Sequence, residues 1–162
     1  MLEDISDIEI DITGECNLRC TYCYLKGGDK YRERKKFVLE KDIDNFLDIY
    51  KKTNGKSVRI SFFGGEPLIE FDKIRYAVNK FRSTIGYKNE LSFRVITNGT
   101  LINNQIAQFC NNNNIYVQVT LDGKEQTHNL QRKSKTGHGS FKEIIRNIKI
   151  LQEYNVKYQI RV

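Results

Sequence analysis

The feature that most constrains the fold of this chain is a regular alternation between two hydrophobic periods. Five segments of five to seven residues have β-type sequence: 8–12, 57–63, 91–96, 115–121 and 156–162. Between them, apolar residues recur every three or four positions, as on the buried face of an α-helix. Strands that alternate with helices form right-handed βαβ units on a parallel sheet. The sequence therefore predicts an α/β fold with a parallel sheet.

Four amphipathic helices are expected, at 43–50, 74–85, 102–110 and 141–151. Glycines are expected to end the first two of them, near Gly55 and at Gly86. Ser140 and Glu143 have the spacing of a capping box, which predicts that the last helix begins just after Ser140.

The stretch 124–139 is polar and lacks a hydrophobic period, so a long loop is expected there. His128 and His138 in this loop are expected to face solvent. Arg132 has two open interpretations, a surface charge or a group that holds a carboxylate.

Composition narrows the class of protein. The chain has 162 residues, the size of one domain, and its 39% hydrophobic and 29% charged residues are typical of a globular protein. It has no apolar run long enough to cross a membrane and no signal-peptide pattern at its start, so a cytoplasmic protein without a membrane partner is expected. The net charge of +7 is dispersed, and its densest basic run, 30–36, is interpreted as a solvated loop. Nucleic acid is therefore not expected as a partner.

Three of the four cysteines are crowded together. Cys16, Cys20 and Cys23 lie within eight residues, whereas Cys110 is distant. Crowded thiols in a chain without an export signal indicate a metal site rather than disulfides. The C-x3-C-x2-C spacing offers three ligands, which suits an iron–sulfur cluster with one open iron better than a four-ligand zinc site. A zinc site completed by Cys110 is the alternative, although Cys110 shares a predicted apolar helix face with Ile106.

Unusual motifs follow each of the first four predicted strands, where parallel sheets carry their functional loops. They are the cysteines, then 64–67 (GGEP), 97–99 (TNG) and 120–123 (TLDG). Paired glycines permit close backbone approach, and Glu66 offers a carboxylate to an ammonium group. The hydroxyl, amide and carboxylate groups of the last two motifs suit ribose hydroxyls. Ordinary turn chemistry is the alternative for each motif taken alone.

These motifs resemble those of a known family. Segment 16–23 (CNLRCTYC) is similar to the C-x3-C-x-aromatic-C motif of radical S-adenosylmethionine (SAM) enzymes, and 64–67 resembles their GGEP motif. The similarity covers 8–162. One further set of residues resembles the peptide- and protein-modifying branch, which includes anaerobic sulfatase-maturing enzymes: 120–123, His128, Arg132, Gly137, Gly139, Ser140 and Phe141. Asn129 and Lys124 depart from that branch, which commonly has Asp and Pro at these positions.

The resemblance implies a fold and a chemistry. The fold is a partial parallel (β/α) barrel of about four βα units plus a fifth strand. Because a complete barrel takes about 250 residues, 1–162 is expected to be the N-terminal portion of a radical SAM domain. The implied cofactors are a [4Fe–4S] cluster and SAM, which is cleaved reductively to a 5′-deoxyadenosyl radical. That radical takes a hydrogen atom from a peptide or protein substrate, and a flavodoxin or ferredoxin is the implied electron donor.

The resemblance also implies roles for individual residues. Three thiolates would hold the cluster, and the open iron would take the amino and carboxylate groups of SAM. The implied cluster ligands are Cys16, Cys20 and Cys23, and the implied SAM contacts are Tyr22, Gly64, Gly65, Glu66, Asn98, Thr120, Asp122 and Arg161. Within this set, Glu66 and the two glycines would bind the methionine amino group, Tyr22 adenine, and Arg161 the carboxylate. A non-catalytic fragment that binds iron–sulfur or zinc and acts through a partner is the alternative function.

Overall fold

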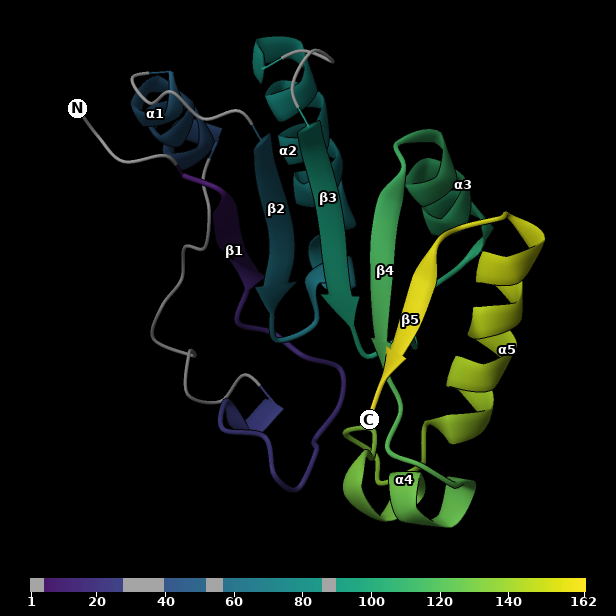
Figure 1. The fold of residues 1–162 in the computed structure, drawn as a ribbon. Helices are drawn as coiled ribbons and strands as arrows, with labels where there is room; N and C mark the ends of the chain where they lie inside the picture. Colours follow the sequence, from purple (N-terminus) through teal and green to yellow (C-terminus); the bar gives the residue numbers. More distant parts are fainter. Residues whose placement is uncertain (1–4, 28–39, 52–56, 86–89) are drawn as a thin grey trace.

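The computed structural model describes residues 5–27, 40–51, 57–85 and 90–162. Their five strands form one sheet in the order β1-β2-β3-β4-β5, and every neighbouring pair is parallel. The strands are β1 (Asp7–Thr13), β2 (Ser57–Gly64), β3 (Glu90–Thr97), β4 (Ile115–Thr120) and β5 (Tyr158–Arg161). The predicted α/β fold with a parallel sheet is confirmed, and the fifth strand is shorter than expected. Figure 1 shows that all five strands end at the same edge of the sheet.

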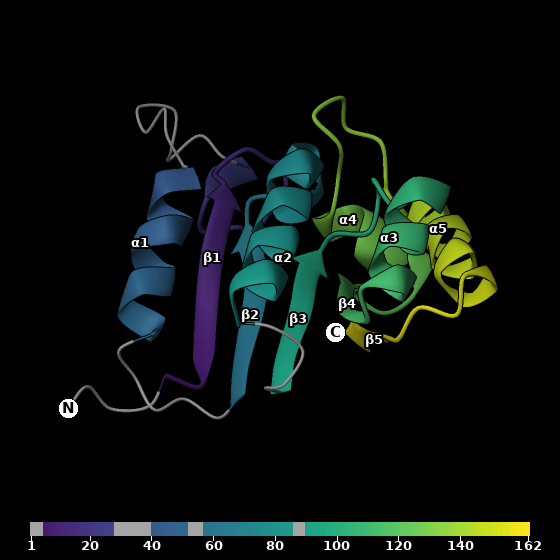
Figure 2. The ribbon, with the colours of Figure 1, turned by 90° about the horizontal axis from the view of Figure 1, so that it is seen from above.

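Helices alternate with these strands. They are α1 (Glu40–Tyr50), the 3-10 helix η2 (Pro67–Glu70), α2 (Phe71–Ile85), α3 (Asn104–Asn112), α4 (Glu125–Gln131) and α5 (Phe141–Glu153). The four longer helices lie on one side of the sheet, which gives the open, partial barrel of the fold prediction (Figures 1 and 2). The expected ends of the first two helices, near Gly55 and at Gly86, and the basic run 30–36 lie outside the described residues.

The hydrophobic core lies between the sheet and these helices. Alternate strand residues point into it, such as Ile60 and Phe62 of β2, which are both 0% exposed. Helix α2 contributes Ile74 and Phe81, which are equally buried. Because one face of the sheet takes up the apolar residues, the opposite face is free to carry polar ones.

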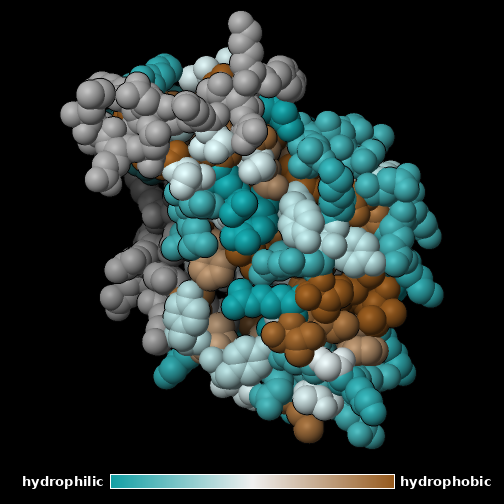
Figure 3. Space-filling view, in the orientation of Figure 1, coloured by the Kyte–Doolittle hydropathy of each residue, from teal (hydrophilic) through white to brown (hydrophobic). Residues whose placement is uncertain are grey.

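The opposite face of the sheet is polar. Arg94 Nη2 lies 4.0 Å from Glu9 Oε1, and Arg94 Nε donates to Ser61 Oγ at 3.2 Å. Further across the face, Gln159 donates to Gln118 Oε1 at 2.7 Å. Figure 3 views this side and shows mainly hydrophilic side chains, with an apolar area to the right of its centre. This face therefore lines the open side of the partial barrel with hydrogen-bonding groups.

For the region after β4, the expected loop is wrong, whereas the expected start of the last helix is confirmed, but without the capping bond. The stretch 124–139 is not only loop, because it contains α4. Ser140 does precede α5, but its side chain makes no capping bond, and its hydroxyl donates to Arg132 O at 3.1 Å instead. The short α4 shows no hydrophobic period because only one of its side chains, His128, is buried.

None of the helices in the described part of the chain is long and apolar enough to cross a membrane.

Candidate functional site

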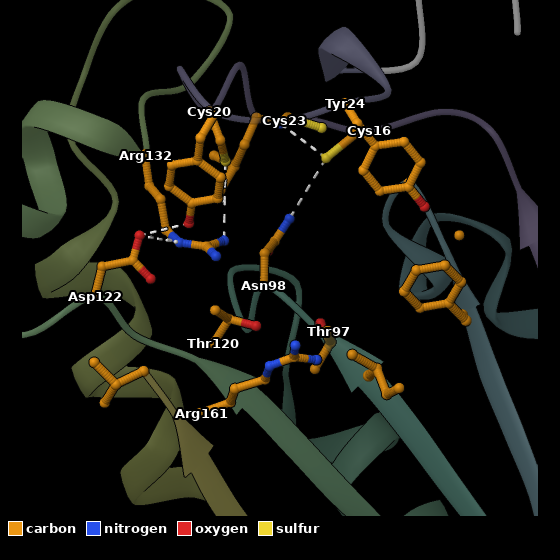
Figure 4. Close-up of a pocket in the computed structure, with 17 residues that line it drawn as sticks. Cys16, Cys20, Cys23, Tyr24, Thr97, Asn98, Thr120, Asp122, Arg132 and Arg161 are labelled. Atoms are coloured by element: carbon orange, nitrogen blue, oxygen red, sulfur yellow. Dashed lines mark hydrogen bonds and ion pairs between the residues drawn. The ribbon is translucent and has the colours of Figure 1, made fainter. Parts of the chain in front are cut away.

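A cavity of about 500 Å³ lies at the carboxyl ends of the strands. Its walls come from the cysteine loop, the ends of β2, β3, β4 and β5, and the residues that follow these strands (Figure 4). All but one of the predicted site residues line it: Cys16, Cys20, Tyr22, Cys23, Gly64, Gly65, Asn98, Thr120, Asp122 and Arg161. The exception is Glu66. The fold thus brings together side chains that are separated by up to 145 positions, from 16 to 161.

Sequence reasoning missed five groups that line the same cavity: Leu18, Tyr24, Phe63, Ile96 and Val162. Thr97 of the TNG motif and Arg132, for which a carboxylate-holding role was left open, line it as well. Phe63 and Ile96 were identifiable in principle, because they alternate with the core residues Phe62 and Val95 and so face the opposite side of the sheet.

The cysteine loop is fixed to the last residue of α4 and to the segment that follows this helix. Arg19 N–H donates to Lys133 O at 2.7 Å, and Thr21 N–H donates to Gln131 O at 2.9 Å. Inside the loop, Cys23 N–H donates to Cys20 O at 3.1 Å, which turns the chain between the last two cysteines. The region predicted as a long polar loop therefore supports the candidate metal ligands.

The cysteine thiols are free and have different surroundings. Cys16 is buried and accepts from Leu18 N–H at 3.5 Å and from Asn98 Nδ2 at 3.9 Å. Cys20 accepts from Arg132 Nη1 at 3.9 Å. Burial raises the pKa of Cys16, and it raises the pKa of Cys20 to about 11 while Arg132 opposes the rise. Thiolates at Cys16 and Cys20 therefore need the compensation that a bound metal supplies.

The donor set fits an iron–sulfur cluster. Three soft sulfur ligands from one loop line a single cavity, and thiolates are the ligands that such clusters take. Among the described residues, no three His, Cys, Asp or Glu side chains are grouped closely enough to hold one metal ion. A cluster is larger than a single ion, so its ligands stand farther apart.

Cys110 does not belong to this site. It lies in α3, is 2% exposed and packs in the hydrophobic core. Burial raises its pKa to about 12. The structure therefore confirms its predicted place on an apolar helix face and gives no support to a zinc site completed by Cys110.

The two glycines of the GGEP segment let it pack against the backbone that precedes Cys16. Gly65 N–H donates to Thr13 O at 2.8 Å, and Gly64 has φ +131°. A Cβ on Gly64 would lie 2.3 Å from Thr13 O, and one on Gly65 would lie 2.2 Å from Glu15 O. The close approach that the sequence indicated is thus to the chain itself, and both glycines also line the cavity.

Glu66 lies beneath the cavity wall and is 0% exposed. Its Oε1 accepts from Leu68 N–H at 3.1 Å and from Thr97 Oγ1 at 2.7 Å, and its Oε2 accepts from Asn98 N–H at 2.7 Å. Burial raises its pKa to about 7, and these three donors act in the opposite direction. The carboxylate is therefore already occupied by donors of the chain itself and positions the end of β3.

Asn98 joins the end of β3 to the cysteine loop. Its Nδ2 donates to Asn17 Oδ1 at 2.8 Å, and its Oδ1 accepts from Thr100 N–H at 2.9 Å. Asn17 Nδ2 in turn donates to Thr100 Oγ1 at 2.8 Å. The three side chains form a closed network beside Cys16.

Arg132 and Asp122 form an ion pair in the cavity wall. The Nε and Oδ2 atoms are 3.0 Å apart, and the two side chains are 10% and 18% exposed. The hydroxyl of Tyr22 donates to the same oxygen of Asp122, and the guanidinium carbon of Arg132 lies 5.4 Å from the centre of the Tyr22 ring. Arg132 is therefore not a surface charge.

His128 is buried behind this pair, contrary to the expectation that it faces solvent. Its Nδ1 accepts from Asp122 N–H at 3.1 Å, and its Nε2 lies 2.9 Å from Ser140 Oγ. Burial lowers its pKa, as does the nearby charge of Arg132. The neutral ring thus fixes the turn after β4. His138 is exposed, as expected.

Comparison with known proteins gives the family. Residues 10–162 match the radical SAM superfamily. The cysteine-type anaerobic sulfatase-maturating enzyme of Clostridium novyi is 35% identical over 152 residues, which is 91% of this chain and 40% of that protein. The serine-type enzyme of Bacteroides thetaiotaomicron is 29% identical over 146 residues, 88% of this chain and 35% of its own.

The fold has a solved counterpart. The structure of native anSMEcpe with bound AdoMet (SAM) and Cp18Cys peptide superposes with a TM-score of 0.84 at 24% identity, covering 96% of this chain and 42% of that one. The chain thus spans about two fifths of the length of these relatives. A match over residues 10–162 is nearly the whole sequence, and the chain belongs to the radical SAM superfamily.

Proposed function

We propose that Cys16, Cys20 and Cys23 hold a [4Fe–4S] cluster and that SAM binds in the adjoining cavity. The observation that carries this proposal is the placement of three free thiols from one loop in the wall of a cavity of about 500 Å³. That volume is in the range of small-molecule sites. When bound, the cluster would supply the electron that cleaves SAM.

The SAM contacts follow from the lining groups. The backbone of Gly64 and Gly65 faces the methionine amino group, and Arg161 offers its charge to the carboxylate. The backbone near Tyr22 contacts adenine. Glu66 acts indirectly, since its oxygens already accept three hydrogen bonds from the chain.

The polar groups of the cavity serve the ribose. Thr120 and Asp122 are placed to meet its hydroxyls from the end of β4, and Asn98 lies across the cavity at the end of β3. Asp122 is held for this role by Arg132 and His128.

The substrate proposed for the whole protein is a peptide or protein, from which a hydrogen atom is abstracted. Three observations support it. The two relatives compared above are named as sulfatase-maturating enzymes, and a structure with the same fold contains a bound peptide. The polar open face of the sheet, with Glu9, Arg94 and Gln118, offers hydrogen-bonding groups next to the cavity. A flavodoxin or ferredoxin is the proposed electron donor.

Anaerobic reconstitution of the chain with iron and sulfide tests the proposal. The expected product is a brown protein with about four irons per chain that forms 5′-deoxyadenosine from SAM when reduced. Exchange of Cys16, Cys20 or Cys23 for Ala should abolish iron retention, whereas Cys110→Ala is the matched control and should retain it. A colourless protein that holds one zinc, or equal loss of iron from Cys110→Ala, would contradict the proposal and favour a non-catalytic metal-binding fragment.

A further inference from the structure

The three candidate cluster ligands differ in the hydrogen-bond donors near their sulfur atoms. Cys16 has two neutral donors, the backbone of Leu18 and the amide of Asn98. Cys20 has a charged donor, Arg132 Nη1, at 3.9 Å (Figure 4). Among the sulfur contacts of the described residues, only that of Cys20 thus involves a full positive charge.

The position of the Arg132 guanidinium is fixed from several sides. Asp122 pairs with its Nε, and the Tyr22 ring lies beside it at 5.4 Å. The backbone of Arg132 is also anchored, because its N–H donates to His128 O at 2.7 Å. With a side chain only 10% exposed, the guanidinium is largely removed from water.

Such burial is costly unless the charge has strong partners. Asp122 is one partner, and a neutral thiol at Cys20 would be a weak second one. A thiolate that belongs to a cluster carries negative charge and accepts a stronger, charge-assisted hydrogen bond. The buried charge of Arg132 is therefore best compensated when Cys20 is a cluster ligand.

Hydrogen bonds to sulfur and the local net charge set the reduction potential of an iron–sulfur cluster. A reduced cluster carries one more negative charge than the oxidised one, so a nearby cation stabilises the reduced form and raises the potential. A nearby carboxylate has the opposite effect. Arg132 and Asp122 lie together next to Cys20 and therefore act with opposite signs.

We propose that Arg132 tunes the reduction potential of the cluster through a charged N–H···S hydrogen bond to Cys20, with the charge of Asp122 partly offsetting that of the guanidinium. The inference rests on the proposed function, since it requires a cluster on the three cysteines. Arg132 thus acts on the cluster through Cys20 and sets its reduction potential. It takes no part in bond breaking.

The experiment is a redox titration of the reconstituted full chain, monitored by electron paramagnetic resonance in the absence of SAM. Arg132→Gln should shift the midpoint potential to a more negative value, and Arg132→Lys, which keeps the charge, should shift it less. Asp122→Asn should shift it to a more positive value. Arg161→Gln is the matched control, because Arg161 lines the same cavity but is exposed and has no described contact with a cysteine.

Opposite shifts for Arg132→Gln and Asp122→Asn, with a smaller shift for Arg161→Gln, would support the inference. Equal shifts of the midpoint potential for Arg132→Gln and Arg161→Gln would overturn it. The absence of a positive shift for Asp122→Asn would also overturn it. If Arg132→Gln retains no iron, the sign of the Asp122→Asn shift decides. Failure of the wild-type chain to take up iron would instead refute the proposed function, and the iron assay separates the two results.

Discussion

The carboxylate of Glu66 accepts the backbone N–H of Asn98 at 2.7 Å across 32 positions of the chain. The bond joins the GGEP segment, which follows β2, to the turn that follows β3. The side chain of Asn98 then reaches Asn17 in the cysteine loop. Three loops that line the cavity are thus linked through one buried carboxylate and the side chain of Asn98.

Replacing Glu66 by Gln should destabilise the protein by about 1–3 kcal/mol at pH 8, because an amide NH2 would face N–H donors that need an acceptor. The measurement is urea unfolding of Glu66→Gln beside Glu70→Gln, which alters a carboxylate in a surface ion pair. SAM affinity should fall as well, since the end of β3 would shift. If Glu66→Gln matched the wild type in stability, the carboxylate would not hold the turn.

Gly65→Ala should be strongly destabilising, because the new Cβ would lie 2.2 Å from a backbone oxygen that cannot move independently. The expected loss exceeds about 2 kcal/mol, as for other overpacking changes. Gly137→Ala is the control. Its φ of +86° makes alanine strained by roughly 1–2 kcal/mol, but nothing lies within 4 Å of the added carbon. Thermal unfolding would rank the two, and a smaller effect for Gly65→Ala would contradict the packing described above.

His128 predicts a dependence of stability on pH. Burial and the charge of Arg132 lower its pKa below the ordinary value of 6.5, while Asp122 acts in the opposite direction. The unfolded chain therefore binds a proton near pH 6.5 that the folded chain resists, and the contribution of His128 to stability is lost as the pH falls below 6.5.

The test compares urea unfolding of the wild type, His128→Asn and His138→Asn from pH 8 to pH 5. The difference in the free energy of unfolding between the wild type and His128→Asn should become smaller as the pH falls, since protonation of the His128 ring removes the acceptor of the Asp122 N–H. His138 is exposed, so His138→Asn should follow the wild-type curve at every pH. A constant difference for His128→Asn would show that its ring does not titrate in this range.

Much of the fold was predictable because its signals are local. The β-type segments and the helix faces appear in consecutive residues, and each predicted strand and helix has a counterpart in the structure. The cavity was also predictable in outline. Motifs that follow parallel strands must meet at one edge of the sheet, and ten of the proposed site residues line one cavity there.

The surroundings of individual site residues were not predictable, because they depend on contacts between segments that are distant in the sequence. Glu66 was expected to face a ligand because its motif shows only that a carboxylate follows two glycines. Its donors include Thr97 and Asn98, which are remote in sequence. Arg132 and His128 were assigned to a loop, because a two-turn helix with one buried residue leaves no hydrophobic period. The TLDG segment with these two residues was the one available signal, and it came from resemblance rather than from spacing.

Thr100→Val should weaken the support of the cysteine loop without touching a cluster ligand. The hydroxyl of Thr100 accepts from Asn17 at 2.8 Å and donates to Asn98 at 2.7 Å, so its loss removes one partner from the buried amide of Asn98 and one from the partly buried amide of Asn17. The expected cost is about 1–3 kcal/mol, with slower or incomplete iron uptake during reconstitution. Thr136→Val is the matched control, since Thr136 is exposed and lies in the turn near His138. Iron bound per chain over time checks the prediction, and equal uptake by both variants would mean that the cysteine loop is held without this network.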